Sequence, residues 1–245
     1  LSMGWSMFST YIIAEDMNIV SVLAPIVDDA ILVKDYNGSA YLIDWNFNGI
    51  GDLEVGQGYQ IKTSAEVSLE VFGDYAFPED YPITLTPGWN IIGYLREQPS
   101  NLAAIFSEIH ASGNLQIVKD YTGSAYLPAW EFNGIGDMQP GQGYQLKMLN
   151  EDVLNYLPND QSYRFGHVSI TQNSSRYFIE KPPTDNNMTI VIEDAAWDKI
   201  PKNGAEIAAY DKQGNLVGSV EYTKPVTVLS VWGDDGLSST KEGLS

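Results

Sequence analysis

Residues 33–60 read VKDYNGSAYLIDWNFNGIGDLEVGQGYQ, and residues 118–145 read VKDYTGSAYLPAWEFNGIGDMQPGQGYQ. The two stretches are identical at 21 of their 28 positions. The match also extends upstream, because Leu1–Trp5 resembles Leu85–Trp89. A long internal match of this kind is typical of a repeated structural unit. The sequence therefore predicts two copies of one module of about 60 residues.

The apolar residues predict the same order of elements in each copy. An apolar opening, at 5–13 or 89–95, indicates a strand and is followed by a helical stretch. In the second copy, Leu102, Ile105, Phe106 and Ile109 have helical spacing. Ser100 or Asn101 is a suitable N-cap, and Gly113 a suitable end. In the first copy 19–26 occupies the same place, with Pro25 disfavouring a last helical turn.

A hairpin follows the helix in each copy. Residues 31–35 and 39–43 flank Tyr36-Asn37-Gly38, and Asn-Gly indicates a tight turn. A last strand is expected at 58–62 and at 143–148. In the first copy we also expect a strand at 66–72. Each unit therefore has the predicted order β-α-β-β-β.

Turn-rich and proline-rich segments divide the rest of the chain. We expect a first repeat module at 1–73, a connector at 74–84 and a second repeat module at 85–149. A linker at 150–185 contains two short apolar runs, 168–170 and 177–179, that could pair as strands. Residues 186–245 form the last region.

The last region contains four short apolar runs separated by turn-forming residues. The runs are 188–192, 206–210, 216–222 and 225–232. Short strands at such spacing are typical of a β-sandwich, and a strand or two needed to close one is missing. The predicted fold class is α+β, mostly β: two homologous β-α-β-β-β modules in tandem plus an incomplete β-sandwich-like C-terminal module.

Composition excludes several classes of function. The 245 residues contain 13 Lys+Arg, 32 Asp+Glu and no cysteine, with a formal net charge of −19. Nucleic-acid binding requires clustered basic residues that displace counterions, so no nucleic-acid partner is expected. No apolar run reaches the roughly 18 residues that span a bilayer, so no membrane insertion is expected. Without cysteine, disulfides and thiolate-ligated metals are excluded.

Two sets of motifs resemble a known class of proteins. The pattern GW(N)…VKDxxGSAYLxxWxFNGIGDLxPGQGYQ resembles a tandem module in large exported or cell-surface proteins of marine Bacteroidetes. The segments NMTIVI (187–192), NGAEIAAYD (203–211), GNLVG (214–218) and VWGDD (231–235) resemble a β module that often follows it. The resemblance implies an extracellular or cell-surface location in an adhesin-like, multi-module protein. It supplies no catalytic residues.

The beginning of the chain also favours this interpretation. Leu1 coincides with the first position of a repeat, and the residues after it lack the basic and apolar regions of a signal peptide. We therefore expect Leu1 to be a cut point within a longer protein.

Aromatic residues recur at the same positions in both copies. Those around the hairpin tips are the candidates for ligand contact, because exposed aromatic faces beside Asp and Asn suit sugar rings or protein surfaces. The candidates are Tyr36, Tyr41 and Trp45, with their counterparts Tyr121, Tyr126 and Trp130. We expect Trp5, Phe47 and their counterparts Trp89 and Phe132 to pack in the core.

One segment resembles a calcium loop in its spacing. Asp44, Asn46, Asn48 and Asp52 stand at positions 1, 3, 5 and 9, with Gly49 at position 6. However, position 12 is Val55, and the second copy has Ala129 at position 1. A structural turn is the alternative. Asp234-Asp235-Gly236 could likewise contribute to a cation site, with a solvated acidic turn as the alternative.

Catalytic motifs are absent from the sequence. The two histidines, His110 and His167, belong to no nucleophile elbow or zinc-protease motif. Two carboxylates would suffice for a glycosidase, but Asp35/Asp120 and Asp52/Asp137 occur in both copies, as framework residues would. Asp35 and Asp120 precede turns, where carboxylates commonly accept backbone hydrogen bonds.

Three interpretations of function follow. The first is a non-catalytic segment of a secreted or cell-surface multi-module protein that binds polysaccharide or a cell-surface protein. The second is a spacer that presents other domains. The third is a polysaccharide-acting enzyme. Exposure of Trp45 and Trp130 distinguishes the first two, and the sequence does not determine the oligomeric state.

Overall fold

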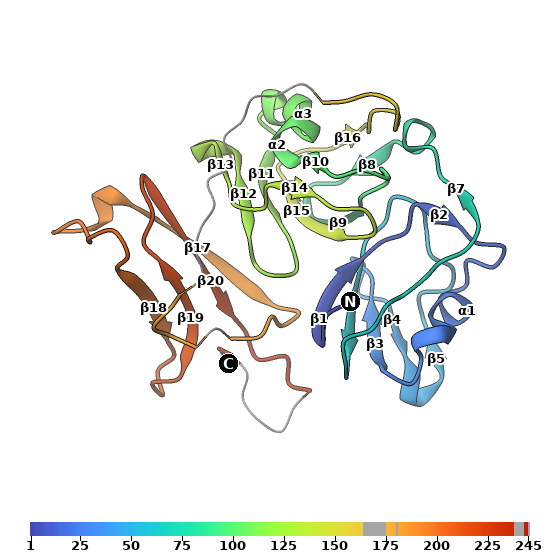
Figure 1. The fold of residues 1–245 in the computed structure, drawn as a ribbon, viewed down its shortest axis with the longest axis horizontal. Coiled ribbons are helices and arrows are strands. Elements are labelled where there is room, and N and C mark those ends of the chain that lie inside the picture. Colours follow the sequence, from blue (N-terminus) through green and yellow to red (C-terminus); the bar gives the residue numbers. More distant parts are fainter. Residues whose placement is uncertain (164–174, 180, 238–242, 245) are drawn as a thin grey trace.

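The structure is a computed structural model that describes residues 1–163, 175–179, 181–237 and 243–244. It is mostly β, with several antiparallel sheets and a few short helices. Figure 1 shows the first copy in blue, the second in green to yellow, and the C-terminal strands in orange to red. The overall β-rich class is therefore as expected.

Residues of the first copy form a five-stranded antiparallel sheet. The strand order is β1-β6-β3-β4-β5. The strands are β1 (Gly4–Phe8), β3 (Ala30–Lys34), β4 (Ala40–Leu42), β5 (Phe47–Asn48) and β6 (Tyr59–Thr63). The expected turn joins β3 to β4, where Gly38 has φ +87°, a conformation that glycine adopts at little steric cost.

A short helix covers one face of this sheet. Helix α1 (Ile19–Leu23) begins at Asn18, whose side chain accepts a hydrogen bond from Val20 N. Pro25 follows, and the chain continues as the 3₁₀ turn η1 (Ala24–Ile26), so the expected break in the last turn is confirmed. The shared core includes Phe8, Ile19, Leu23, Val33, Tyr41, Tyr59 and Ile61.

Residues of the second copy form a sheet with the corresponding strand order, β13-β12-β11-β15-β9. Its strands are β9 (Gly88–Gly93), β11 (Leu115–Lys119), β12 (Ala125–Leu127), β13 (Phe132–Asn133) and β15 (Gly143–Met148). In both sheets a 3₁₀ turn, η2 (Ile43–Trp45) or η4 (Pro128–Trp130), separates the last two strands of the hairpin region. The two short strands β5 and β13 were missed from sequence.

The predicted second helix is present as two segments. Helix α2 (Leu102–Ile105) begins at the N-cap Asn101, and α3 (Ser107–Ser112) ends at Gly113, which has φ +74°. Phe106 separates the segments and is fully buried in the core beneath them. The expected cap and the expected end are therefore both confirmed.

The two sheets meet through reciprocal backbone contacts. Ser9 N donates to Gly141 O at 2.9 Å, and Gly93 N donates to Gly56 O at 2.8 Å. Ser9 and Gly93 are equivalent when Trp5 is aligned with Trp89, as are Gly56 and Gly141. Such an exchange of equivalent contacts is the property of a two-fold interface. Gly58 also lies here, where an added Cβ would approach Ile92 O to 2.5 Å.

Short strand pairs complete the two halves. They are β2 (Ile12–Ile13) with β7 (Asp74–Tyr75), β8 (Ile83–Leu85) with β16 (Asp152–Leu154), and β10 (Ser100–Asn101) with β14 (Asp137–Met138). A 3₁₀ turn, η3 (Pro78–Asp80), follows β7. Strand β8 begins in the expected connector (74–84), and β16 lies in the expected linker (150–185). These two segments therefore pair with each other.

Two strand predictions in the first copy need correction. The expected strand at 5–13 is divided: the ladder with β6 ends at Phe8, Ser9 then contacts Gly141 of the second copy, and β2 pairs with β7. The expected strand at 66–72 is absent, because these residues have no regular secondary structure and belong to no sheet. Hydrogen bonds connect Val67 with Leu1, in both directions, which is too short a pairing for a ladder.

The C-terminal region consists of two antiparallel ribbons. One pairs β17 (Asn187–Glu193) with β20 (Val226–Trp232), and the other pairs β18 (Glu206–Tyr210) with β19 (Leu216–Glu221). The 3₁₀ turn η5 (Asp194–Ala196) follows β17. Val217, Val220, Leu229 and Val231 form a core between the ribbons. The four expected strands of this region are therefore confirmed.

The two strands expected in the linker have different outcomes. Residues 168–170 lie outside the described part of the chain. Residues 177–179 form a bend and not a strand. The backbone N–H groups of Arg176 and Tyr177 donate to the carboxylate of Glu206, so they are not available to a neighbouring strand.

Candidate functional site

The tyrosines at the centre of the predicted aromatic platform are buried. Tyr41 is 3% exposed and Tyr126 is 2% exposed. Successive strand residues point to opposite faces of a sheet, and in both hairpins the tyrosine lies in the helix-covered core. Tyr126 OH lies 3.0 Å from His110 Nδ1 there. The expectation that these two tyrosines are exposed is wrong.

The first hairpin nevertheless presents three aromatic side chains. Trp45 is 78% exposed, Phe47 55% and Tyr36 39%. The expectation that Phe47 packs in the core is wrong, because Phe47 lies at the end of the sheet beside β4, where its side chain stays exposed. Asp44 and Asn46 are also exposed and flank Trp45 in the sequence.

The corresponding face of the second hairpin is covered by the C-terminal strands. Phe132 is 1% exposed and packs in one cluster with Val226 and Val228 of β20. Trp130 remains partly exposed, and its Nε1 donates a 2.8 Å hydrogen bond to Glu193 Oε1 of β17. Tyr121 is half-buried, with its OH 3.4 Å from Ser2 Oγ. The same surface is thus an internal contact in one copy and exposed in the other.

The tip of the second hairpin touches strand β20. Ser230 Oγ donates to Gly123 O at 2.6 Å, and a Cβ added to Gly123 would lie 2.7 Å from that hydroxyl oxygen. At Gly38, the equivalent position of the first copy, an added Cβ would meet no atom within 4 Å. Glycine is therefore needed at position 123 for two reasons: its positive φ angle and the close approach of Ser230.

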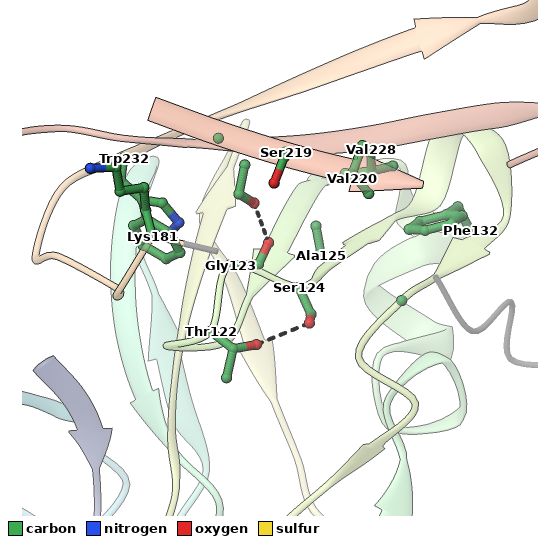
Figure 2. Close-up of a pocket in the computed structure, with 13 residues that line it drawn as sticks. Thr122, Gly123, Ser124, Ala125, Phe132, Lys181, Ser219, Val220, Val228 and Trp232 are labelled. Carbon is green, nitrogen blue, oxygen red and sulfur yellow. Dashed lines mark hydrogen bonds between the residues drawn. The ribbon is translucent and has the colours of Figure 1, made fainter. Parts of the chain in front are cut away.

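A cavity of about 290 Å³ lies beside this contact. Figure 2 shows Thr122, Gly123 and Ser124 on one side of it, with Ser219, Val220 and Trp232 of the C-terminal strands on the other. Its hydroxyl groups and Lys181, which also lines it, make it suited to a small polar molecule.

A second group of contacts joins the C-terminal region to the first sheet. Trp5 and Lys62 are direct partners on β1 and β6, and Lys34 lies on the next strand, β3. We call Trp5, Lys34 and Lys62 the Trp5 site. Trp5 Nε1 donates to Asp235 Oδ2 at 2.8 Å, and Lys62 Nζ donates to the same oxygen at 2.5 Å.

The Trp5 site holds two carboxylates. Lys34 Nζ pairs with Asp185 Oδ2 at 2.5 Å, while Asp235 has a fully buried side chain. Burial alone would raise the pKa of Asp235, but hydrogen bonds from Lys62, the Leu237 amide and Trp5 outweigh it, so the pKa lies below its ordinary value. The expectation of a solvated turn at 234–236 is therefore wrong for Asp235.

The second copy contains the equivalent three residues, Trp89, Lys119 and Lys147, which we call the Trp89 site. Trp89 pairs with Lys147 in the register of β9 and β15. Lys119 Nζ donates to Asn187 Oδ1 at 2.6 Å. Lys147 has no hydrogen-bond or ion-pair partner among the residues that the structure describes, and Trp89, which we expected to be buried, is 44% exposed.

No protein-family model, curated protein or solved structure matches this chain. The interpretation of these surfaces therefore depends on their geometry and on the comparison between the two copies.

The residues of the candidate calcium loop bind protein donors. Asn48 Oδ1 accepts from Ile50 N and Gly51 N, and Asp52 Oδ1 accepts from Asn18 Nδ2. Asn46 has φ +48° at the end of η2, next to the exposed Asp44. These contacts are those of a structural turn. Within the described residues, no group of three or more His, Cys, Asp or Glu could hold a metal ion.

The repeated aspartates before the hairpin turns act as turn caps. Asp35 Oδ1 accepts from Asn37 N and Ser39 N, and Asp120 Oδ1 accepts from Thr122 N and Ser124 N. This agrees with their expected framework role. His110 contacts Tyr126, and His167 lies outside the described residues. No helix in the described part of the chain is long and apolar enough to cross a bilayer.

The Trp5 and Trp89 sites were missed by reasoning from sequence. A signal was present, since Lys34 and Lys62 recur as Lys119 and Lys147 in a chain with only 13 basic residues. Sequence spacing alone could not show that these lysines flank a tryptophan on one face of a sheet.

Lys119 makes stability depend on pH in a testable way. Burial lowers the pKa of Lys119 from 10.5 to about 8. Between these values the unfolded chain binds more protons, so this residue makes the free energy of unfolding rise with pH, by at most about 1.4 kcal/mol per unit. We expect Lys119→Met to remove this dependence. Urea unfolding of both proteins at pH 7.5 and pH 10 measures it, and parallel changes in the two proteins would contradict the assignment.

Proposed function

We propose that this chain is a non-catalytic binding segment of a secreted or cell-surface multi-module protein. The proposal rests on one observation: the outer surface of the hairpin is buried in the second copy and exposed in the first. Phe132 and its neighbours bury against β20, whereas Phe47 and Trp45 are exposed at the equivalent place. Exposed aromatic groups of this kind are typical of interaction surfaces.

We further propose that the chain contains two copies of one module in tandem, followed by a partial β-sandwich. The 21 identities in 28 positions support this organisation. It is also supported by the equivalent strand order of the two sheets and by the reciprocal contacts of Ser9 and Gly93.

The second hairpin indicates what kind of protein surface would fit the first. Its apolar residues pack against valines of β20, and its tryptophan donates to a glutamate of β17. A partner for the first hairpin would accordingly present branched aliphatic side chains on a strand, with a carboxylate within reach of Trp45 Nε1. A cell-surface protein built from β modules meets this description.

Polysaccharide is the second candidate ligand. Trp45 is 78% exposed, and the exposed Asp44 and Asn46 are next to it in sequence. An indole face with neighbouring polar side chains suits the apolar face and hydroxyl groups of a sugar ring.

The remaining interpretations receive less support. A spacer without a ligand was expected to bury its repeated tryptophans, but Trp45 is 78% exposed and Trp130 39% exposed. An enzyme would require converging catalytic groups, whereas the repeated aspartates Asp35 and Asp120 bind the backbone of their own turns.

The variants Trp45→Ala and Trp130→Ala test the proposal as a matched pair. The intact chain is titrated with neutral glucans, with uronate-containing polysaccharides and with a second copy of itself, while the indole N–H signals are followed by NMR. We expect at least one ligand to shift the Trp45 signal and to bind about tenfold more weakly to Trp45→Ala. Binding to Trp130→Ala should stay unchanged.

Two results would contradict the proposal. One is the absence of any shift of the Trp45 signal with all three kinds of ligand. The other is an equal loss of binding in both variants, which would show that the exposed hairpin is not the contact surface.

A further inference from the structure

The Trp5 and Trp89 sites have nearly the same internal geometry. Lys34 Nζ lies 4.8 Å from the centre of the Trp5 ring, and Lys62 Nζ lies 5.9 Å from it. In the second copy, Lys119 Nζ lies 4.8 Å and Lys147 Nζ 5.8 Å from the centre of the Trp89 ring. The two lysines therefore lie at the same distances from the indole ring in the Trp89 site as in the Trp5 site, where carboxylates are bound.

The occupant of the Trp5 site shows which chemistry this arrangement binds. A single oxygen of Asp235 accepts hydrogen bonds from Trp5 Nε1 and Lys62 Nζ. Charge-assisted hydrogen bonds of this kind are short and strong. Trp5 is 4% exposed beneath this contact, whereas Trp89 is 44% exposed.

We propose that the Trp89 site binds a carboxylate side chain of an acidic polypeptide segment. Trp89 Nε1 and Lys147 Nζ would donate to one carboxylate oxygen, as Trp5 and Lys62 do to Asp235. This proposal concerns the second sheet and not the exposed hairpin of the first, and it does not rest on the function proposed above.

The contacts of Lys119 show how many carboxylates the Trp89 site can bind. In the first copy two carboxylates are bound, Asp185 at Lys34 and Asp235 at Lys62. In the second copy Asn187 already accepts from Lys119, the counterpart of Lys34. One carboxylate position, beside Lys147, therefore remains for a ligand.

The backbone around Asp235 favours a polypeptide as the source of that carboxylate. Asp235 Oδ1 accepts a hydrogen bond from Leu237 N, while Oδ2 contacts the Trp5 site. The turn thus fixes one oxygen and directs the other toward the indole and the ammonium group. A ligand segment with an aspartate two residues before an amide N–H can form the same turn.

Charge also supports an acidic ligand at this position. Lys62, the counterpart of Lys147, pairs with an acidic side chain in the first copy, and the Trp–Lys register is the same in both copies. Trp89 and Lys147 provide one aromatic N–H and one ammonium group on the same strand pair, β9 and β15. Electrostatic attraction between exposed groups weakens with ionic strength, and binding should therefore fall as salt is added.

The test uses the intact chain labelled with ¹⁵N and a capped peptide of the sequence Gly-Asp-Asp-Gly-Leu-Ser, which copies residues 233–238. The control peptide is Gly-Asp-Asn-Gly-Leu-Ser. We expect the first peptide to shift the indole N–H signal of Trp89, which is assigned with Trp89→Phe. The control peptide should bind about tenfold more weakly, since it lacks the second carboxylate.

Two variants separate loss of binding from loss of folding. Lys147→Met should reduce peptide binding about tenfold, while Lys147→Arg retains the charge and should restore most of it. The remaining indole signals report that each variant is folded. Trp45→Ala, in the hairpin of the first sheet, should bind the peptide as the unaltered chain does.

Three results would overturn the proposal. The first is no shift of the Trp89 signal at about 10 mM peptide, the range of weak binding. The second is equal binding of the two peptides. The third is a shift of the Trp89 signal by an oligouronate but not by the peptide, which would assign the site to acidic polysaccharide.

Discussion

Replacing Phe132 with alanine is expected to lower the free energy of unfolding by about 3 kcal/mol. Phe132 is 1% exposed and packs between the second hairpin and Val226 and Val228 of β20. Removing the ring leaves a cavity between the second hairpin and β20. Neither element can move to fill this cavity without losing other contacts. Urea unfolding followed by circular dichroism measures the change.

Phe47→Ala is the matched control for this prediction. Phe47 is the equivalent residue of the first copy, but it is 55% exposed. Truncating a side chain that remains largely in water costs little, and we expect a change below about 1 kcal/mol. Similar losses in the two variants would contradict the view that only the second hairpin is covered.

Asp235→Asn is expected to be the second strongly destabilising change, at about 3 kcal/mol. The substitution leaves Lys62 without its charged partner at a site where the lysine side chain is 13% exposed. Removing one member of a buried ion pair costs more than the pair contributes, because the remaining charge stays buried. Protection of the β1 amides against hydrogen exchange should fall together with stability.

Asp234→Asn removes the same charge from the neighbouring position. Among the residues that the structure describes, the Asp234 carboxylate accepts a hydrogen bond only from Gly236 N of its own turn, so this variant should keep nearly full stability. Equal losses would attribute the effect to net charge. The Asp235 contribution should also disappear in the unaltered protein as pH falls below about 4, through the lowered folded-state pKa of Asp235.

Local sequence signals predicted most of the fold. Asn101 and Gly113 mark the limits of the second helical region, and Asn37-Gly38 marks a hairpin, because these signals act through backbone conformation and nearby hydrogen bonds. The strand expected at 66–72 failed for the opposite reason. An apolar extended segment becomes a strand only if a partner lies beside it, and partners are set by the tertiary fold.

The candidate site was less predictable than the fold. Tyr41 and Trp45 are four residues apart, yet one is buried and the other exposed, which depends on the direction of each side chain in the hairpin. Phe47 and Phe132 occupy similar sequence environments, each followed by Asn-Gly-Ile-Gly-Asp, and differ in exposure because the C-terminal strands cover one and not the other. No local pattern contains that information.

The hydrogen bond between Trp5 and Asp235 joins residues 230 positions apart in the chain. During synthesis, the first sheet can form once its own residues have emerged, but its acidic partner is added much later. At roughly 5–20 residues per second, the indole and both lysines would face the surroundings uncovered for roughly 10–30 s. The first copy therefore passes through an interval in which its tryptophan and the lysine beside it are accessible to any nearby acidic chain, as Trp89 and Lys147 are in the folded second copy.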